Sequence, residues 1–127
     1  MEPTEFLQDG TVSVSEETYA VCRAVDGHDT AFATVRDETE TTVVVEQHNI
    51  DTVDASKVES GWKRLTFEME LPFELVGFLA AVATALADVD VSVFVLSTYS
   101  TDHVFVKTED VDSAVSQLET LGCTVTD

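Results

Sequence analysis

The chain has 127 residues, and 25 Asp and Glu against 6 Lys and Arg give it a formal net charge of −19 at pH 7. Proteins that bind nucleic acid neutralise phosphates with clustered Lys and Arg, whereas the basic residues here are few and scattered. Composition therefore argues against nucleic acid and anionic membrane as partners, and length allows one compact domain or two small units that share a core.

The first part of the chain, residues 1–61, is predicted to be rich in β structure. Alternating or β-branched runs predict strands over Thr11–Ser15, Tyr19–Val25, Ala31–Arg36 and Thr41–Glu46. Asp26–Asp29 is expected to form a turn in which Gly27 is able to take a positive φ, and Asp37–Glu40 a polar hairpin tip. Residues 47–61 are polar and leave room only for a short helical turn, so the boundary between two halves is placed at Gly61.

The second part, residues 62–127, has a clearer pattern of alternating element types. Period-2 and continuous apolar runs predict strands, and apolar residues spaced three and four apart predict helices. The expected strands are Trp62–Leu71, Val91–Leu96, His103–Lys107 and Cys123–Thr126, and the expected helices are Leu75–Leu86 and Glu109–Leu121. Their order, β-α-β-β-α-β, is the ferredoxin-like pattern of an α+β fold.

The high negative charge is interpreted as an adaptation to a salt-rich cytoplasm, with an ordinary acidic protein as the alternative. At about 1 M salt the screening length falls to roughly 3 Å, which removes most of the self-repulsion of such a surface. Lysine is scarce, and valine and threonine are abundant, as in proteins of salt-accumulating archaea. An acidic start without an apolar run predicts no signal peptide, so a cytoplasmic protein is expected.

Enzyme and metal motifs are absent from the sequence. It contains no Walker loop, GxGxxG, HExxH or GxSxG. His28, His48 and His103 fall on separate predicted elements, and Cys22 and Cys123 are isolated, so no metal site, cofactor or disulfide is expected. Ser100, Asp102 and His103 are close in sequence, but adjacent residues at the start of a strand point in different directions. A hydrolase or isomerase that uses Asp102 and His103 therefore ranks as the weakest of three functional hypotheses.

Two predicted loops are expected to lie beside each other. In a β-α-β-β-α-β unit, the loop before the first helix, Leu71–Gly77, neighbours the loop after the second strand, Ser97–His103. The helix N-terminus near Gly77 offers unpaired N–H groups and a positive dipole that suit a carboxylate. Asp102 offers a carboxylate that suits an ammonium or guanidinium group. Together they predict a site for a small zwitterion.

A family resemblance supports this prediction. Residues 71–106, with Gly77 before a helix, Val91-Ser92 and the string STYSTDH at residues 97–103, resemble ACT-type domains. The branch is the one that includes tandem ACT-like bacterial proteins and the cytosolic arginine sensor of animals. The resemblance covers residues 62–127 well and implies a regulatory fold that binds free amino acids, often between two ACT units. Residues 1–61 would then be a degenerate, β-rich ACT-like half.

The resemblance implies specific site residues. Gly77 with its neighbours Val76 and Phe78 would supply backbone contacts, and Thr98, Tyr99 and Asp102 the opposite wall. The acid that the arginine sensor carries just before its glycine is displaced here; Glu74 would substitute for it, but Leu75 and Val76 make the loop more apolar. This difference argues against arginine as the ligand.

Two functions from different classes follow from the sequence. The first is a non-catalytic regulatory module that binds a free amino acid and acts as a homo-oligomer, most simply a dimer. The second is a structural or adaptor module that associates through an exposed sheet edge and binds no ligand. Plain structural roles stay open for the key residues: Gly77 for close packing of helix on sheet, and Asp102 for capping its own turn.

Overall fold

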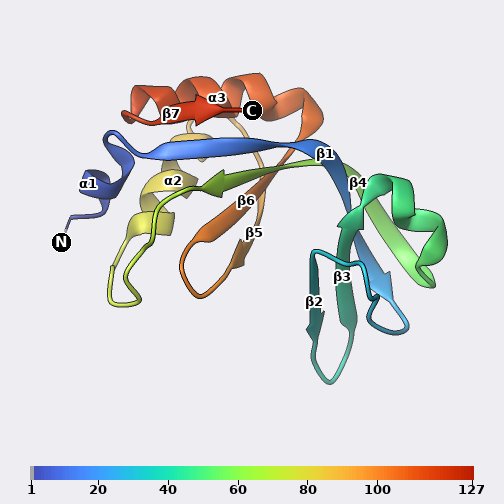
Figure 1. Ribbon diagram of the computed structural model, residues 1–127. Helices are drawn as coiled ribbons and strands as arrows, with labels where there is room; N and C mark the ends of the chain where they lie inside the picture. The colour runs from blue at the N-terminus through green and yellow to red at the C-terminus, as the bar shows by residue number, and fades with distance from the viewer. Residues whose placement is uncertain (1) are drawn as a thin grey trace. The chain divides into compact units, whose positions relative to one another are not determined.

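The computed structural model describes residues 2–127 (Figure 1). The chain forms two compact units: the N-terminal segment up to Glu16 together with Lys63–Asp127, here called the C-terminal unit, and Glu17–Trp62, here called the central unit. Two long strands, β1 (Thr11–Ala24) and β4 (Ala55–Phe67), contribute to both units. No helix of the described residues is long and apolar enough to cross a membrane.

The C-terminal unit contains the predicted β-α-β-β-α-β order, which confirms the α+β, ferredoxin-like fold class. Along the chain its elements are β4, α2 (Phe78–Ala87), β5 (Val93–Ser97), β6 (Asp102–Lys107), α3 (Val111–Thr120) and β7 (Thr124–Thr126), with the 3-10 turn η2 (Thr108–Asp110) before α3. Strands β5 and β6 form an antiparallel hairpin in which Ser97 pairs with Asp102. The strands of this unit are ordered β7-β1-β4-β6-β5.

The start of the chain is part of this sheet. Strand β1 pairs in parallel with β7, from Thr11 opposite Thr124 to Ser13 opposite Thr126, so it lies between β7 and β4. It is preceded by a short helix, α1 (Pro3–Leu7), which the sequence pattern did not predict. The side chain of Leu7 is fully buried in the core of the unit. The division of the chain at residue 61 into two ACT-like halves stays a prediction. The compact units are divided differently, because the segment up to Glu16 belongs with Lys63–Asp127.

The core of the C-terminal unit lies between the sheet and the two helices, α2 and α3. Figure 1 shows these helices in yellow and orange-red, and Gln117 Nε2 on α3 donates a 2.8 Å hydrogen bond to the carbonyl of Ala85 on α2. Buried side chains from both partners fill the space, among them Leu65, Phe67, Val104 and Val106 from the strands and Phe78, Val82, Leu86, Ala114 and Leu118 from the helices. The three- and four-residue spacing of the helical residues explains why each helix presents one apolar face.

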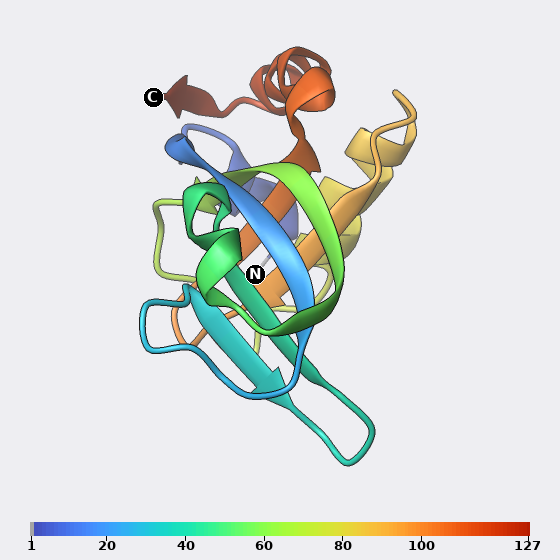
Figure 2. The same cartoon turned by 90° about the vertical axis from the view of Figure 1, so that its right-hand side faces the viewer.

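The central unit is a small antiparallel sheet. Strand β3 (Thr41–Glu46) lies between β2 (Ala33–Arg36) and the second half of β1. Its core contains Ala20, Cys22, Val43 and Val45, and the 3-10 helix η1 (Gln47–Thr52) follows β3. The tip of the β2–β3 hairpin, drawn in teal in Figure 2, is closed by Asp37, whose Oδ1 accepts hydrogen bonds from the N–H groups of Thr39 at 2.8 Å and Glu40 at 2.9 Å. This confirms the predicted polar hairpin tip.

Several predicted boundaries in the first part of the chain were wrong. Residues 11–24 form one strand instead of two, although Ser15–Thr18 is polar. Backbone pairing does not need an apolar side chain, and the hydroxyl oxygen of Ser15 also accepts a 3.0 Å hydrogen bond from the N–H of Arg64. Strand β4 begins at Ala55, inside the segment predicted to be a linker. Gly27 does not have a positive φ; among the described glycines, Gly61, Gly77 and Gly122 do.

Boundaries in the second part differ for local reasons. Strand β4 ends at Phe67 rather than Leu71. Helix α2 starts at Phe78 rather than Leu75, because Gly77 occupies the N-cap with φ +87° and so leaves Leu75 outside the helix. Strand β5 is half-buried rather than covered on both faces, since it is the last strand of its sheet. Gly122 follows α3 with φ +103°, as its position predicted.

Candidate functional site: a pocket between two loops

A pocket of about 370 Å³ lies in the C-terminal unit, between the connection from β4 to α2 and the turn that joins β5 to β6. Five of the residues predicted from the sequence line it: Gly77, Phe78, Thr98, Tyr99 and Asp102. The two loops that were expected to be neighbours therefore form its opposite walls. Glu74 and Val76, which belong to the same prediction, do not line the pocket.

Hydrogen bonds hold the two loops at a fixed separation. The hydroxyl of Thr101 donates to the carbonyl of Phe67 at 2.6 Å, and the N–H of Leu71 donates to the carbonyl of Ser100 at 2.6 Å. The turn itself is closed by the N–H of Thr98, which donates to the carbonyl of Thr101 at 2.8 Å. The connection from β4 is thus tied to the β5–β6 turn at two points, once by the Thr101 side chain and once by a bond between backbone groups.

Asp102 contributes a carboxylate to one wall. It is the first residue of β6 and faces its cross-strand partner Ser97, whose hydroxyl donates to Oδ1 of Asp102 at 2.6 Å. The residue is half-buried. Within the described residues, the other carboxylate oxygen accepts no hydrogen bond. Ser97 therefore orients the carboxylate and leaves one oxygen for a molecule in the pocket.

The N-terminus of α2 forms the facing wall. Gly77 is the N-cap, and no side chain of the described residues caps the helix there. The first N–H groups of a helix have no partner within it, and the helix dipole adds positive potential. Phe78, Leu79 and Ala80, the first three helical residues, all line the pocket. A negatively charged group in the pocket would therefore meet N–H donors.

Two aromatic side chains contact each other at the pocket, and the sequence did not predict this contact. Phe73 and Tyr99 contact each other edge to face, with ring centroids 4.8 Å apart and planes at 84°. They are 72% and 79% exposed, so most of the surface of each ring faces solvent. Tyr99 was predicted as a site residue, whereas Phe73 lies in a non-periodic loop and carried no pattern. The only signal was its place directly after Pro72, where the strand was expected to stop.

The imidazole of His103 contacts the neighbouring strand β4. Its Nδ1 lies 3.0 Å from the hydroxyl oxygen of Thr66 on β4, and it does not line the pocket. Burial lowers the pKa of its imidazole and nearby Arg64 lowers it further, while Asp102 and Glu68 act in the opposite direction. Ser100 contributes only its carbonyl to the contact with Leu71 described above. The structure gives no support to the hydrolase hypothesis at these residues.

A comparison with protein-family models matches residues 57–120 to the ACT domain. The chain belongs to the ACT domain family. The match begins within β4, ends with α3 and includes every residue of the pocket walls, so the STYSTDH resemblance is confirmed at the level of the family. No curated protein sequence matches this ACT domain chain.

Solved structures show the same fold along nearly the whole chain. A protein from Agrobacterium tumefaciens is 21% identical with a TM-score of 0.77, and 94% of each chain is covered. A protein of unknown function from Vibrio cholerae, titled a possible transport protein, is 28% identical with a TM-score of 0.71 and the same coverage. The regulatory subunit of aspartate kinase from Thermus thermophilus is 7% identical with a TM-score of 0.65, covering 88% of this chain and 95% of that one.

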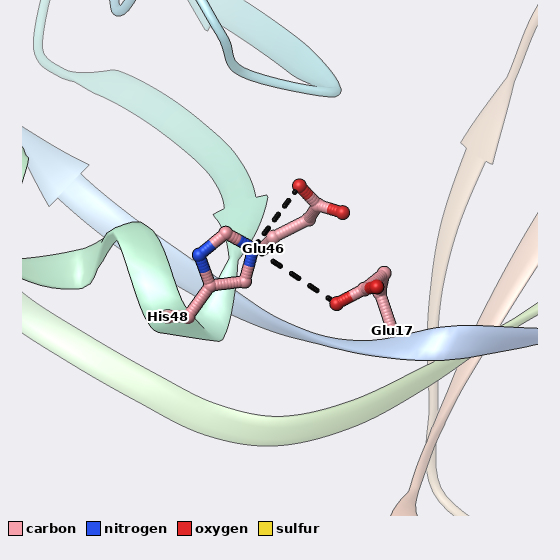
Figure 3. A group of neighbouring side chains, drawn as sticks. All are labelled: Glu17, Glu46 and His48. Atoms are coloured by element: carbon pink, nitrogen blue, oxygen red, sulfur yellow. Dashed lines mark ion pairs between the residues drawn. The ribbon is translucent and has the colours of Figure 1, made fainter.

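The central unit of the ACT domain chain holds a second group of polar side chains (Figure 3). Nε2 of His48 lies 3.4 Å from a carboxylate oxygen of Glu46 and 3.9 Å from one of Glu17. The antiparallel register of β1 and β3, with Tyr19 opposite Glu46, brings together residues that are far apart in sequence, which is why sequence spacing did not reveal them. Donors of this kind are ligands for divalent metal ions. All three side chains are substantially exposed, and exposed acidic groups commonly gather in this way without a metal ion.

Proposed function

We propose that this ACT domain chain is a non-catalytic regulatory module that binds a free amino acid, or a similar small zwitterion, in the pocket described above. The observation that carries the proposal is the pairing of opposite electrostatic partners on opposite walls. The N-terminus of α2 suits a carboxylate, and the Asp102 carboxylate suits an ammonium group. An α-amino acid carries both of these groups on the same carbon atom.

Each wall has a defined role in this proposal. The first-turn N–H groups of Phe78 and Leu79 would bind the ligand carboxylate. Gly77 precedes them with φ +87°, a backbone conformation that favours glycine, and would add its own backbone contacts. Asp102, oriented by Ser97, would bind the ammonium group. Thr98 and Tyr99 would form the rest of that wall.

The two remaining residues of the sequence-based prediction have no role in this arrangement. Glu74 and Val76 are exposed and lie outside the pocket, so they are assigned no ligand contact.

Regulation would follow from how the ligand bridges the two loops. A ligand that contacts both walls binds best when they are held in one arrangement, and its differential affinity shifts the population toward that arrangement. We propose that the arrangement is communicated through association with a second copy or with an enzyme subunit. The same fold in the regulatory subunit of aspartate kinase from Thermus thermophilus supports a regulatory role.

The deciding experiment is isothermal titration calorimetry of the full chain against the twenty amino acids. It should be run at about 2 M KCl, where surface repulsion between the acidic side chains is screened. We expect at least one amino acid to bind, and the Asp102→Asn variant to lose most of that affinity. Asp112→Asn, an exposed acid in the first turn of α3, is the matched control and should bind normally. Failure of all twenty to bind would overturn the proposal.

The high KCl concentration is chosen because we also propose that the chain works in a salt-rich cytoplasm. A net charge of −19 on 127 residues is self-repelling at low ionic strength. We expect the melting temperature to rise between about 0.1 and 2 M KCl as the screening length shortens. A melting temperature that is unchanged or falls over this range would contradict the salt adaptation without affecting ligand binding.

A second function, a ligand-free adaptor, is favoured by the exposed edge of the sheet. Among the described residues, strand β5 (Val93–Ser97) has a neighbour, β6, on one side only, and it carries no charge or proline to discourage pairing. An adaptor would associate through this edge regardless of amino acids. Sedimentation at several salt concentrations, with and without amino acids, distinguishes the functions: the adaptor predicts an assembly whose size does not respond to any of them.

A further inference from the structure

The charges that line the pocket restrict the ligand more narrowly than the class of free amino acids. Among the described residues that line it, Asp102 is the only one with an ionisable acidic or basic side chain other than the phenol of Tyr99, and none is Lys, Arg or His. The other polar side chains carry hydroxyls and come from the end of β5 and from the β5–β6 turn. The remaining walls are apolar and include Leu71, Leu75 and Leu79.

Each charged group on the α-carbon of an amino acid would have one partner of opposite charge in the pocket. Its carboxylate would take the N-terminus of α2, and its ammonium group would take the one oxygen of Asp102 that accepts no hydrogen bond from the described residues. A second positive charge, as in lysine or arginine, would find no further carboxylate. A second negative charge, as in aspartate or glutamate, would find no side-chain cation. An unpaired charge placed against an apolar wall loses hydration without compensation.

The aromatic pair supplies a surface for the ligand side chain instead. Phe73 comes from the connection before α2 and Tyr99 from the β5–β6 turn, so the pair joins the two loops at the pocket. Each ring is more than two-thirds exposed, at 72% and 79%. An apolar ligand side chain would cover part of this area and of the neighbouring leucines, which is favourable in water.

We infer that the ligand is an amino acid with a neutral, apolar side chain, of the leucine, methionine or phenylalanine type. This inference rests on the proposed function, because it assumes that the α-carboxylate and α-ammonium groups occupy the two polar walls. The inference excludes arginine, the ligand of the sensor that the sequence resembles, and acidic amino acids as the preferred ligands of the pocket.

Competition between side-chain classes tests the inference. Calorimetry at about 2 M KCl should give a dissociation constant for leucine, methionine or phenylalanine at least about tenfold lower than for arginine, lysine, aspartate or glutamate. Tighter binding of a charged amino acid would overturn the inference while leaving the proposed function intact. Binding of a polar, uncharged amino acid alone would also overturn the inference, whereas the proposed function itself would be overturned only if none of the twenty amino acids binds.

A matched pair of variants tests the aromatic wall. Phe73→Ala removes an exposed ring, so the fold should be retained, and it should weaken binding of the apolar amino acid about five- to tenfold. Val89→Ala removes an exposed aliphatic group beyond the opposite end of α2 and should leave the affinity unchanged. Equal affinities of Phe73→Ala and the unaltered chain, with circular dichroism showing both folded, would contradict a role for the ring.

Discussion

The hydroxyl group of Thr101 donates a 2.6 Å hydrogen bond to the backbone carbonyl of Phe67, across 34 residues of sequence. Phe67 is the last residue of β4, and Thr101 is the last residue of the β5–β6 turn. The bond therefore fixes the point at which the chain leaves the sheet and enters the loop that forms one wall of the pocket. Positions along that wall depend on this anchor.

Thr101→Val tests the anchor, because it keeps the shape of the side chain and removes the donor. We expect a loss of about 1 kcal/mol in the free energy of unfolding, since the carbonyl of Phe67 loses a partner. Chemical denaturation in KCl measures this change. Thr124→Val, at an exposed position of β7, should change stability by less than about 0.5 kcal/mol. Equal effects of the two substitutions would show that the bond does not stabilise the fold.

The glycines at positive φ give a second prediction, because two of them differ in their surroundings. At Gly122, with φ +103°, an added Cβ would lie 3.0 Å from the Cα of Gln8, whereas at Gly61, with φ +85°, it would meet nothing within 4 Å. Both alanine variants bear the cost of a left-handed backbone, about 1 kcal/mol. Gly122→Ala should cost more, because the contact is with backbone that cannot rotate away.

The measurement for these variants is the free energy of unfolding. We expect Gly122→Ala to be the less stable of the two by about 1–2 kcal/mol, the range for overpacking a close contact. The difference reports how tightly the turn after α3 packs on the residues that follow α1. Identical losses in both variants would mean that the segment around Gln8 moves aside without cost.

His103 gives a prediction about pH. Burial and the positive charge of Arg64 lower the pKa of its imidazole below the ordinary value near 6.5. As pH falls through that ordinary value, the unfolded chain therefore binds a proton before the folded chain does, and the free energy of unfolding decreases. The contribution of His103 to the free energy of unfolding should be fully present above about pH 7.5 and should decline toward about pH 5.5.

The His103→Gln variant isolates this contribution, since glutamine does not titrate and can still contact Thr66. Denaturation at about pH 7.5, 6.5 and 5.5 should show a smaller decrease for the variant than for the unaltered chain. The difference between the two curves, rather than either curve alone, is the quantity to compare, because the many carboxylates titrate in both. Parallel curves would rule out a contribution from His103.

The two cysteines give a prediction about reactivity. Cys22 and Cys123 are 1% and 6% exposed, and burial raises the pKa of both thiols. Because the thiolate is the reactive form, both should react slowly with a thiol reagent in the folded chain and rapidly after unfolding. Counting modified thiols against time in KCl, with and without denaturant, measures this. Rapid modification of one thiol in the folded state would show that the unit around it opens locally.

Local pattern was sufficient for the elements that carry their own periodicity. The run of β-branched residues over Thr41–Glu46 predicted β3 to the residue, and the leucine and valine spacing in α2 identified its buried face. The same is true of the pocket walls, since the β-α-β-β-α-β order alone predicted that the loops at Gly77 and Asp102 would meet. Elements formed by neighbours in sequence are those that sequence periodicity describes best.

Long-range pairing and side-chain direction were not predictable in this way. Strand β1 was divided because polar residues interrupt its pattern, yet its backbone pairs with strands on both sides. Helix α1 has five residues, too few for a periodic signal. Glu74 was placed in the site as a substitute for the acid that the arginine sensor carries before its glycine, and Val76 as a neighbour of Gly77; neither residue lines the pocket. In a non-helical loop, however, the direction of each side chain depends on the local φ and ψ angles, and both side chains are exposed.

The parallel pairing of β1 with β7 has a consequence for how the chain folds. Thr11 must find Thr124, a contact between distant parts of the sequence, before the sheet of the C-terminal unit is complete. Contacts of such high sequence separation slow folding, because the entropy of closing the loop is lost before the contact forms. During synthesis β1 leaves the ribosome before β7 does, so it cannot pair with β7 until that strand has been made. Until then the side of β1 that will pair with β7 remains an open strand edge.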